Sequence, residues 1–367
     1  MPALNIMIKP ASGLCNLRCR YCFYRDVARN RDVDSYGIMT PETLEAVIRE
    51  IFAYADTECT IAWQGGEPTL AGLDFFRHYI ALEEKYNVRK IPVHRVIQTN
   101  GYVLDEEWAV FLAEHKFLTG LSLDGVRNSH DRNRVTPEGE GSFSKVFAAA
   151  KLLERHGVDF NILTVVNPET VSRIRQIYAF YGRQGFSYQQ YIACLDPLGE
   201  VPGGQSWSLT PELYGKFLID LFELWYQDCL RGRAPYIRQF DNYIAILRGY
   251  QPESCEQRGV CGLQTVVEAD GSVYPCDFYV MDEYRLGNLR QDSLAELAVH
   301  PLRRQFFERS VPLAEGCDRC PYRLLCRGGC FRHRLTEEGG TNRFCAAYRM
   351  FFDRCLPRLQ QLARAGR

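Results

Sequence analysis

The segment Cys15-Asn16-Leu17-Arg18-Cys19-Arg20-Tyr21-Cys22 places three cysteines close together near the start of the chain. It follows a short apolar run, Leu4–Ile8, whose pattern predicts a first strand. Three thiolates can hold one metal centre, but they leave one position of a four-ligand set open. Structural zinc sites normally close with four ligands, whereas an iron–sulfur cluster on three cysteines keeps one iron open. The spacing therefore favours an iron–sulfur cluster over a zinc knuckle with a distant fourth ligand.

Strand and helix patterns alternate over about the first 195 residues. Helices are predicted after Thr40, with Pro41 in the first turn, and after Asp105. Apolar runs predict six strands, at Leu4–Ile8, Cys59–Trp63, Val93–Gln98, Leu118–Leu123, Phe160–Val166 and Tyr188–Ala193. The alternation predicts an α/β fold with a parallel sheet. Six such units fit a partial (β/α)6 TIM-like barrel better than an open doubly wound sheet, and a barrel gathers function at the C-terminal strand ends.

The pattern of predicted strands and helices changes twice along the chain and thereby predicts three regions. Residues 1–200 carry the alternating strands and helices of the barrel. Residues 201–250 form a helical linker region, and residues 251–367 form a Cys-rich domain that ends in a helix.

The overall composition excludes several classes of protein. The 367 residues include 44 Lys+Arg and 45 Asp+Glu, which gives a formal charge of −1, and 46% of them are hydrophobic. Such a chain buries a sizeable core, and its charge argues against a nucleic-acid binder, which needs a basic surface. No apolar run approaches the roughly 20 residues that span a bilayer, and no signal peptide is recognisable. We therefore expect a cytoplasmic protein without nucleic-acid or membrane partners.

Eight of the 15 cysteines lie in the C-terminal third of the chain. They are Cys255, Cys261, Cys276, Cys317, Cys320, Cys326, Cys330 and Cys345. Disulfides are rare in the cytosol, so metal or redox chemistry is favoured. Eight thiolates can fully ligate two 4Fe–4S clusters. Two zinc ribbons would also use eight, but they favour two Cys-x2-Cys pairs per site, and only Cys317 and Cys320 have that spacing.

Charge near these cysteines also fits anionic clusters. Residues 301–367 contain 14 Arg, no Lys and six Asp+Glu. Arg can neutralise a cluster and donate hydrogen bonds to its sulfurs, although a solvated basic surface would have the same composition. Four further cysteines are scattered singly and fit small buried side chains: Cys59, Cys194, Cys229 and Cys355.

The N-terminal cysteine segment resembles the cluster loop of radical S-adenosylmethionine enzymes. In that superfamily the open iron binds S-adenosylmethionine, and reduction cleaves it to methionine and a 5′-deoxyadenosyl radical. Gln64-Gly65-Gly66-Glu67-Pro68, at the end of the second predicted strand, is similar to the Gly-Gly-Glu-Pro element of the superfamily. The resemblance implies a cluster on Cys15, Cys19 and Cys22. It also implies that the nucleoside contacts Tyr21, Gly66, Ser122, Arg134 and Leu195.

The Cys-rich tail resembles the SPASM auxiliary-cluster domain, which implies three 4Fe–4S clusters in all. By this resemblance one auxiliary cluster uses Cys255, Cys261, Cys276 and Cys330. The other uses Cys317, Cys320, Cys326 and Cys345. Nearly the whole chain resembles anaerobic sulfatase-maturating enzymes, most sharply at Pro275-Cys276-Asp277-Phe278-Tyr279 and Cys326-Arg327-Gly328-Gly329-Cys330.

These enzymes oxidise a cysteine or serine in a Cys/Ser-x-Pro/Ala-x-Arg motif to Cα-formylglycine. The resemblance implies an unfolded or nascent sulfatase polypeptide as partner and a reduced flavodoxin or ferredoxin as electron donor. It identifies Asp277 as the catalytic base, because the target thiol or hydroxyl holds its proton near neutral pH. Asp277 directly follows Cys276, so base and electron acceptor would share one loop.

Two other functions remain open. A SPASM peptide maturase would form thioether or carbon–carbon crosslinks, but such proteins often carry an N-terminal peptide-recognition extension, and here the first strand begins near residue 4. An iron–sulfur electron carrier without catalysis would need neither an open cluster site nor a Gly-Gly-Glu-Pro element. The sequence does not decide between a cysteine and a serine target.

Overall fold

The computed structural model describes residues 4–262, 264–335 and 340–366. The chain forms two compact units, each assembled from separate stretches of sequence. The first unit contains Met1–Ser122, Arg134–Phe160 and Gly262–Phe306. The second contains Leu123–Asn133, Asn161–Cys261 and Phe307–Arg367. The domain boundaries expected at residues 200 and 250 stay predictions.

The first unit is built on a largely parallel sheet. Its strands are β1 (Leu4–Ile8), β2 (Cys59–Trp63), β3 (Val93–Thr99), β4 (Leu118–Ser122), β8 (Thr265–Val267), β9 (Ser272–Tyr274) and β10 (Gly287–Asn288). They are ordered β10-β9-β8-β1-β2-β3-β4, and only the β8-β9 and β9-β10 pairs are antiparallel. Strands β1 to β4 neighbour one another in chain order, as in a barrel, whereas a doubly wound sheet reverses its order.

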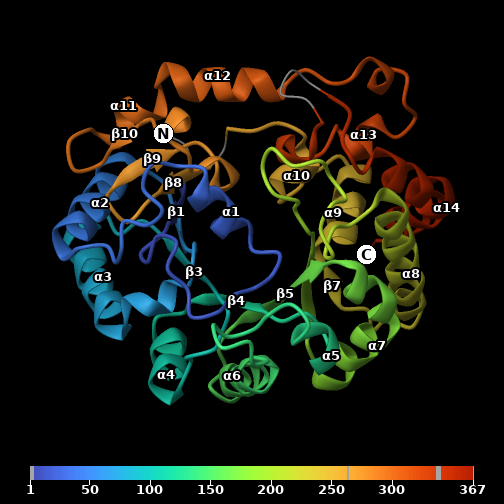
Figure 1. The fold of residues 1–367 in the computed structure, drawn as a ribbon, viewed down its shortest axis with the longest axis horizontal. Helices are drawn as coiled ribbons and strands as arrows, with labels where there is room; N and C mark the ends of the chain where they lie inside the picture. Colours follow the sequence, from blue (N-terminus) through green and yellow to red (C-terminus); the bar gives the residue numbers. More distant parts are fainter. Residues whose placement is uncertain (1–3, 263, 336–339, 367) are drawn as a thin grey trace. The chain divides into compact units, whose positions relative to one another are not determined.

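Helices connect these strands and cover the outer side of the sheet (Figure 1). The helices of this unit are α1 (Phe23–Arg29), α2 (Pro41–Tyr54), α3 (Leu73–Tyr86), α4 (Glu106–Glu114), α6 (Phe143–Arg155) and α11 (Leu294–Ala298). Two begin as the sequence predicts: the Thr40 side chain accepts the Thr43 N–H, and Asp105 accepts the Trp108 N–H. These caps satisfy backbone donors that the first turn leaves unpaired.

Aromatic side chains fill the space between the sheet and its helices. Trp63, Phe76, Tyr79 and Phe117 are each buried almost completely. The Trp63 ring meets Phe76 and Tyr79 edge-on, with centroids 5.3 and 4.8 Å away. Burying a large apolar side chain contributes about 1.5–3 kcal/mol. This packing holds the strands in place and thereby positions the loops at their C-terminal ends.

The second unit has a short parallel sheet flanked by long helices. Its strands are β5 (Phe160–Val166), β6 (Tyr188–Ala193) and β7 (Tyr236–Ile237), again paired in chain order. Its helices include α5 (Arg127–His130), α7 (Pro168–Gln184), α8 (Pro211–Leu230), α9 (Arg238–Leu247), α10 (Cys255–Arg258), α13 (Arg323–Cys326) and α14 (Cys345–Arg364). Helix α12 (Pro301–Ser310) contributes residues to both units.

Helix α14 packs along α8 and α9 through an aromatic seam (Figure 1). Phe351 of α14 contacts Phe222 and Phe240 at ring-centroid distances of 5.7 Å each. Arg358 of α14 also forms a two-bond ion pair with Glu223 of α8, at 2.6 and 2.8 Å. The helical C-terminus is thereby fixed against the helices that precede the Cys-rich segment.

The predicted α/β class, with six parallel strands alternating with helices, is confirmed. The six strands have nearly the predicted bounds: β3 extends by one residue to Thr99, and β4 ends one residue early at Ser122. The short strands β7 to β10 were not predicted, because two or three residues carry no readable periodicity. Among the helices that the structure describes, none has the length and apolar character needed to cross a membrane.

Candidate active site

The N-terminal cysteine loop lies between β1 and α1, where the first β-α connection of a barrel places functional groups. Burial is the main cause that raises the pKa of Cys15, and the neighbouring Cys19 and Cys22 thiols add to the rise. The Cys15 sulfur accepts a hydrogen bond from the Leu17 N–H at 3.4 Å. The Asn100 amide, which follows β3, donates to the Cys15 sulfur at 3.7 Å. The structure therefore brings the three predicted ligands of the first cluster together.

A buried arginine stands beside this loop. Arg134 is 6% exposed, and its Nη1 donates to the Cys19 sulfur at 4.0 Å. Its guanidinium lies 5.5 Å from the centre of the Tyr21 ring. A buried cation beside a thiol of this loop suits both an anionic cluster and the carboxylate of a bound nucleoside. The three cysteines and Arg134 thus fit the predicted iron–sulfur cluster with bound S-adenosylmethionine.

The Gly-Gly-Glu-Pro element is tied to the cysteine loop. The Glu67 N–H donates to the Leu14 carbonyl at 2.8 Å. Gly66 has a φ of +50°, and a Cβ there would lie 2.2 Å from the same carbonyl oxygen, so only glycine allows this approach. The Glu67 carboxylate is 1% exposed and accepts hydrogen bonds from the Thr99 hydroxyl and the Asn100 N–H, both at 2.7 Å. Burial raises the pKa of Glu67, and these donors oppose the rise.

Polar groups occupy the ends of β3 and β4. Gln98 donates to the Ser122 hydroxyl at 3.2 Å. Gly120 makes room for this contact, because a Cβ there would lie 2.0 Å from Gln98 Oε1. Ser122 is 9% exposed, so it lies almost buried at a strand end. Leu195 follows β6 in the second unit, where it is also 9% exposed.

Asp277 lies in a short 3-10 turn, η2 (Asp277–Tyr279), directly after Cys276. It is 5% exposed, and the Tyr24 hydroxyl donates to its Oδ2 at 2.6 Å. The Gln64 amide donates to the Tyr24 hydroxyl at 2.7 Å. Asp277 Oδ1 has no hydrogen-bond partner among the described residues. A buried carboxylate oxygen without a partner can accept a proton from a ligand, as the predicted role requires.

A buried cation lies next to this chain of hydrogen bonds. The Lys9 ammonium lies 5.0 Å from the Tyr24 ring centre and 3.4 Å from a Glu268 carboxylate oxygen, which also accepts from Arg31 at 2.6 Å. Burial raises the pKa of Asp277, and Lys9 is the strongest opposing influence. Gly65 makes room for Lys9, because a Cβ there would lie 2.4 Å from Lys9 Cε.

The sequence did not assign functions to Gln64, Tyr24 and Lys9. Gln64 directly precedes the Gly-Gly-Glu-Pro element, and Tyr24 follows the last cysteine of the loop by two positions. Their proximity to motif residues was the available signal, but nothing in the local sequence links either residue to Asp277, which lies more than 200 positions further along the chain.

The cysteines of the second unit form two groups. The first, the Cys330 group, contains Cys255, Cys261 and Cys330. Burial, and then the neighbouring Cys255, raises the pKa of Cys330, and Cys261 adds to the rise. These three residues belong to one predicted ligand set. The fourth member of that set, Cys276, is half-buried in the first unit.

The second group, the Cys326 group, contains Cys317, Cys320, Cys326 and Cys345. Burial raises the pKa of Cys326 to about 11, the Gly328 N–H opposes the rise, and the other three thiols add to it. This group coincides with the other predicted ligand set. Within the described residues, no three His, Cys, Asp or Glu side chains are arranged to hold a single metal ion. The assignment of each cysteine to a cluster stays a prediction.

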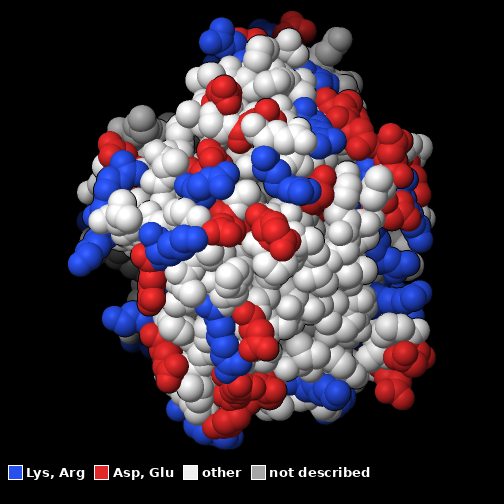
Figure 2. Space-filling model, turned by 90° about the vertical axis from the view of Figure 1, so that its left-hand side faces the viewer, with Lys and Arg blue, Asp and Glu red and all other residues white. Residues whose placement is uncertain are grey.

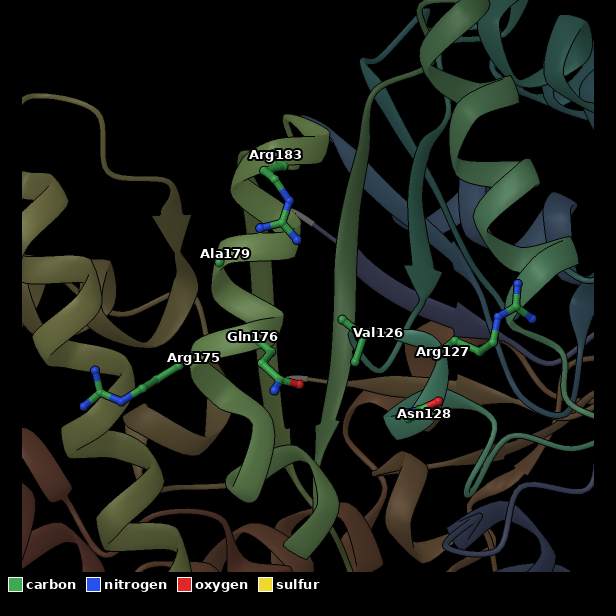
Figure 3. Close-up of a pocket in the computed structure, with 7 residues that line it drawn as sticks. All are labelled: Val126, Arg127, Asn128, Arg175, Gln176, Ala179 and Arg183. Carbon is green, nitrogen blue, oxygen red and sulfur yellow. The ribbon is translucent and has the colours of Figure 1, made fainter.

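A cavity of about 560 Å³ is lined by none of these residues. It is lined by parts of α5 and α7, including Arg127, Arg175 and Arg183 (Figure 3). The Arg127 and Arg175 side chains extend in opposite directions, so the cavity does not gather their charges. On the face shown in Figure 2, basic and acidic side chains are interspersed, in keeping with the near-neutral charge of the chain.

Comparison with known proteins identifies both domains. The sequence model of the Radical SAM superfamily matches residues 10–181, and that of SPASM, an iron-sulfur cluster-binding domain, matches residues 259–321. The cysteine-type anaerobic sulfatase-maturating enzyme of Clostridium perfringens (strain 13 / Type A) is 44% identical over 366 residues, which cover 99% of each chain. This chain belongs to the anaerobic sulfatase-maturating enzymes. The expected radical S-adenosylmethionine superfamily, SPASM domain and enzymatic function are confirmed.

A second relative and two solved structures are also similar to this chain. The serine-type anaerobic sulfatase-maturating enzyme of Klebsiella pneumoniae is 31% identical and covers 98% of this chain and 89% of its own. A solved structure, native anSMEcpe with bound AdoMet and Cp18Cys peptide, is 42% identical with a TM-score of 0.95 and complete coverage of both chains. Streptococcus suis SuiB, at 19% identity and a TM-score of 0.63, covers 93% of this chain and 77% of its own, and shares the fold.

Proposed function

We propose that this sulfatase-maturating enzyme converts a cysteine of an unfolded or nascent sulfatase polypeptide to Cα-formylglycine, in a Cys-x-Pro/Ala-x-Arg motif. The choice of cysteine over serine rests on the two sets of relatives. Identity is 44% to a cysteine-type enzyme and 31% to a serine-type enzyme, at nearly full coverage of this chain in both cases. We further propose that the protein acts in the cytoplasm and receives electrons from a reduced flavodoxin or ferredoxin.

The observation that carries this proposal is the arrangement of Asp277, Tyr24 and Gln64. When bound, the clusters and S-adenosylmethionine supply the radical that removes a hydrogen from the target Cβ and the acceptor for the remaining electron. Asp277 accepts the proton of the target thiol on its unpartnered Oδ1, so that a carbon–sulfur double bond can form. Water then replaces the sulfur, which leaves as hydrogen sulfide, and the aldehyde results. Tyr24 donates to Oδ2 and Gln64 fixes the Tyr24 hydroxyl, which keeps the carboxylate oriented.

Other predicted residues would bind the nucleoside. Arg134 pairs with its carboxylate, and Tyr21 packs against the Arg134 guanidinium. Gly66 allows the backbone to approach the nucleoside. Ser122 provides a hydroxyl for a hydrogen bond to the nucleoside, and Gln98 already holds this hydroxyl in place. Leu195 supplies an apolar surface. Each of these contacts is a proposal carried over from the resemblance to the superfamily.

The test is an anaerobic incubation of the iron-loaded protein with S-adenosylmethionine, a reductant and a sulfatase peptide that carries the motif. A second peptide differs only by serine in place of the target cysteine. We expect mass spectra to show formylglycine in the cysteine peptide at a much higher rate. A thioether or carbon–carbon crosslink, or cleavage of S-adenosylmethionine with no peptide product, would refute the proposal.

A further inference from the structure

Arg334 is a buried arginine that neither the fold nor the proposed chemistry explains. It follows the 3-10 turn η5 (Phe331–His333) and is 8% exposed. Its Nη1 donates to the carbonyls of Ser310 and Pro312, at 2.6 and 3.0 Å. Its Nη2 donates to the carbonyls of Gly259 and Gly329, at 2.8 and 3.4 Å. The guanidinium is thereby fixed by three separate stretches of backbone.

The partners of this cation are neutral, so its charge is not balanced by them. Burying a cation is costly unless it is paired with negative charge. Burial lowers the pKa of Arg334, and the influences opposing this come from four thiols: Cys261, Cys330, Cys317 and Cys326. The first two belong to the Cys330 group and the last two to the Cys326 group. The guanidinium therefore lies within electrostatic reach of both predicted cluster sites.

One donor of Arg334 remains unused. Its Nε has no acceptor among the described residues, although the atom is buried. A buried N–H without an acceptor costs free energy, and native structures seldom leave one. Cluster sulfurs and ligating thiolates accept hydrogen bonds, and such bonds tune the reduction potential of a cluster. The unused Nε–H thus fits a site that a cluster completes.

The segment Cys326-Arg327-Gly328-Gly329-Cys330 is shaped to enclose Arg334. Gly328 has a φ of +80°, and a Cβ there would lie 2.3 Å from Leu313 Cδ2 and 3.2 Å from Arg334 Nη2. Asn342 closes the turn by donating to the Gly328 carbonyl at 3.1 Å. This segment begins with a member of one cysteine group and ends with a member of the other. The glycines therefore let the short turn between the two cysteine groups pack closely against the Arg334 guanidinium.

We propose that Arg334 tunes the reduction potentials of both auxiliary clusters, through its charge and its Nε–H. The inference rests on the proposed cluster ligands and not on the proposed substrate. An oxidised 4Fe–4S cluster with four thiolates carries about two negative charges, and reduction adds one more. A fixed cation nearby stabilises the reduced form, so Arg334 raises both potentials.

The test compares Arg334→Gln and Arg334→Lys with a matched control, Arg323→Gln. Arg323 carries the same charge, but its side chain is 54% exposed and paired with Asp318 at 2.7 Å. Water therefore screens its effect. All variants are made in the full chain with the three N-terminal loop cysteines changed to Ala, so that only auxiliary-cluster signals remain. Iron content and midpoint potentials are measured by chemical analysis and by EPR-monitored redox titration.

We expect Arg334→Gln to keep its iron and to shift both midpoints to more negative values. The equilibrium constant for reduction should fall about tenfold, which is about 59 mV for a one-electron couple. Arg334→Lys keeps the charge but not the Nε–H, so its shift should be smaller, and Arg323→Gln should match the parent protein.

Unchanged midpoints in Arg334→Gln, or an equal shift in Arg323→Gln, would overturn the proposal. Loss of auxiliary iron from both Arg334 variants would also overturn it, because Arg334 would then only tie the loop together. If the Gln variant alone loses iron, the Lys variant decides: a shifted midpoint supports the proposal and an unchanged one refutes it. No peptide substrate enters these measurements, so a failed formylglycine assay leaves their outcome intact.

Discussion

Asp277→Asn removes the proposed proton acceptor and nearly preserves the shape of the side chain. The amide oxygen can still accept the 2.6 Å hydrogen bond from the Tyr24 hydroxyl, but the amide cannot take a proton from a thiol. General-base catalysis contributes about 10²–10⁴-fold to a rate. We therefore expect formylglycine formation to fall by about this factor, which is about 3–5 kcal/mol in activation free energy.

Tyr24→Phe is the matched variant, because it keeps the carboxylate and removes only the hydrogen bond to it. A hydrogen bond to a charged group contributes about 1.5–3 kcal/mol, so this change should cost about 10–150-fold in rate. Tyr24 is proposed to act through Asp277. The double variant should therefore be no slower than Asp277→Asn alone, since coupled residues are not additive.

The assay counts two products in the same anaerobic reaction: 5′-deoxyadenosine by chromatography and formylglycine by mass spectrometry of the peptide. Asp277→Asn should retain all its iron and still form 5′-deoxyadenosine, yet make little formylglycine. Full formylglycine formation by this variant would remove Asp277 from the mechanism. Loss of iron would show instead that the change disturbs the loop that carries the neighbouring cluster ligand, Cys276.

Further outcomes are expected elsewhere in the molecule. Changing the three cysteines of the N-terminal loop to Ala should leave about eight iron atoms instead of about twelve and abolish nucleoside cleavage; about four irons, or bound zinc, in the intact protein would contradict this. Ser122→Ala and Arg134→Ala should weaken S-adenosylmethionine binding in equilibrium titrations without changing the iron content, and unchanged affinity in both would count against their placement. Glu223→Gln should lower the free energy of unfolding at pH 7 by about 0.5–1 kcal/mol. Its hydrogen bonds with Arg358 lower the pKa of Glu223, so the stabilisation exists above the unfolded-state pKa of about 4.3 and is lost as the pH falls through the folded value. Urea unfolding at about pH 7 and pH 4 should therefore show a difference between variant and parent that shrinks at the lower pH, and a difference that grew would refute this reasoning.

Much of the barrel could be predicted because its signals are local. Each strand from β1 to β6 is an apolar run of five to seven residues, and the caps at Thr40 and Asp105 are determined by a few neighbouring residues. Strands β8 to β10 have two or three residues each and form only because β1 offers a free edge to β8. No local pattern encodes that pairing, so the sequence did not reveal it.

In the candidate site, too, local patterns could be predicted from the sequence and long-range contacts could not. The cysteine spacing predicted the first ligand group, and the cysteines of the C-terminal third predicted two further clusters. The hydrogen bond between Tyr24 and Asp277 joins residues 253 positions apart, and the Lys9–Gly65 contact depends on how two strand ends meet. Arg334 was one of 14 arginines in its region, and only the folded structure shows that it is buried.

The way in which Glu67 fastens the cysteine loop has a consequence for repair after exposure to oxygen. Glu67 is fixed through the Leu14 carbonyl of the loop, the Thr99 hydroxyl and the Asn100 N–H, none of which is a cluster ligand. Oxidative loss of iron therefore removes none of these bonds. A protein that has lost its iron would keep the conformation of the ligand loop. A new cluster would then be inserted without refolding of the chain.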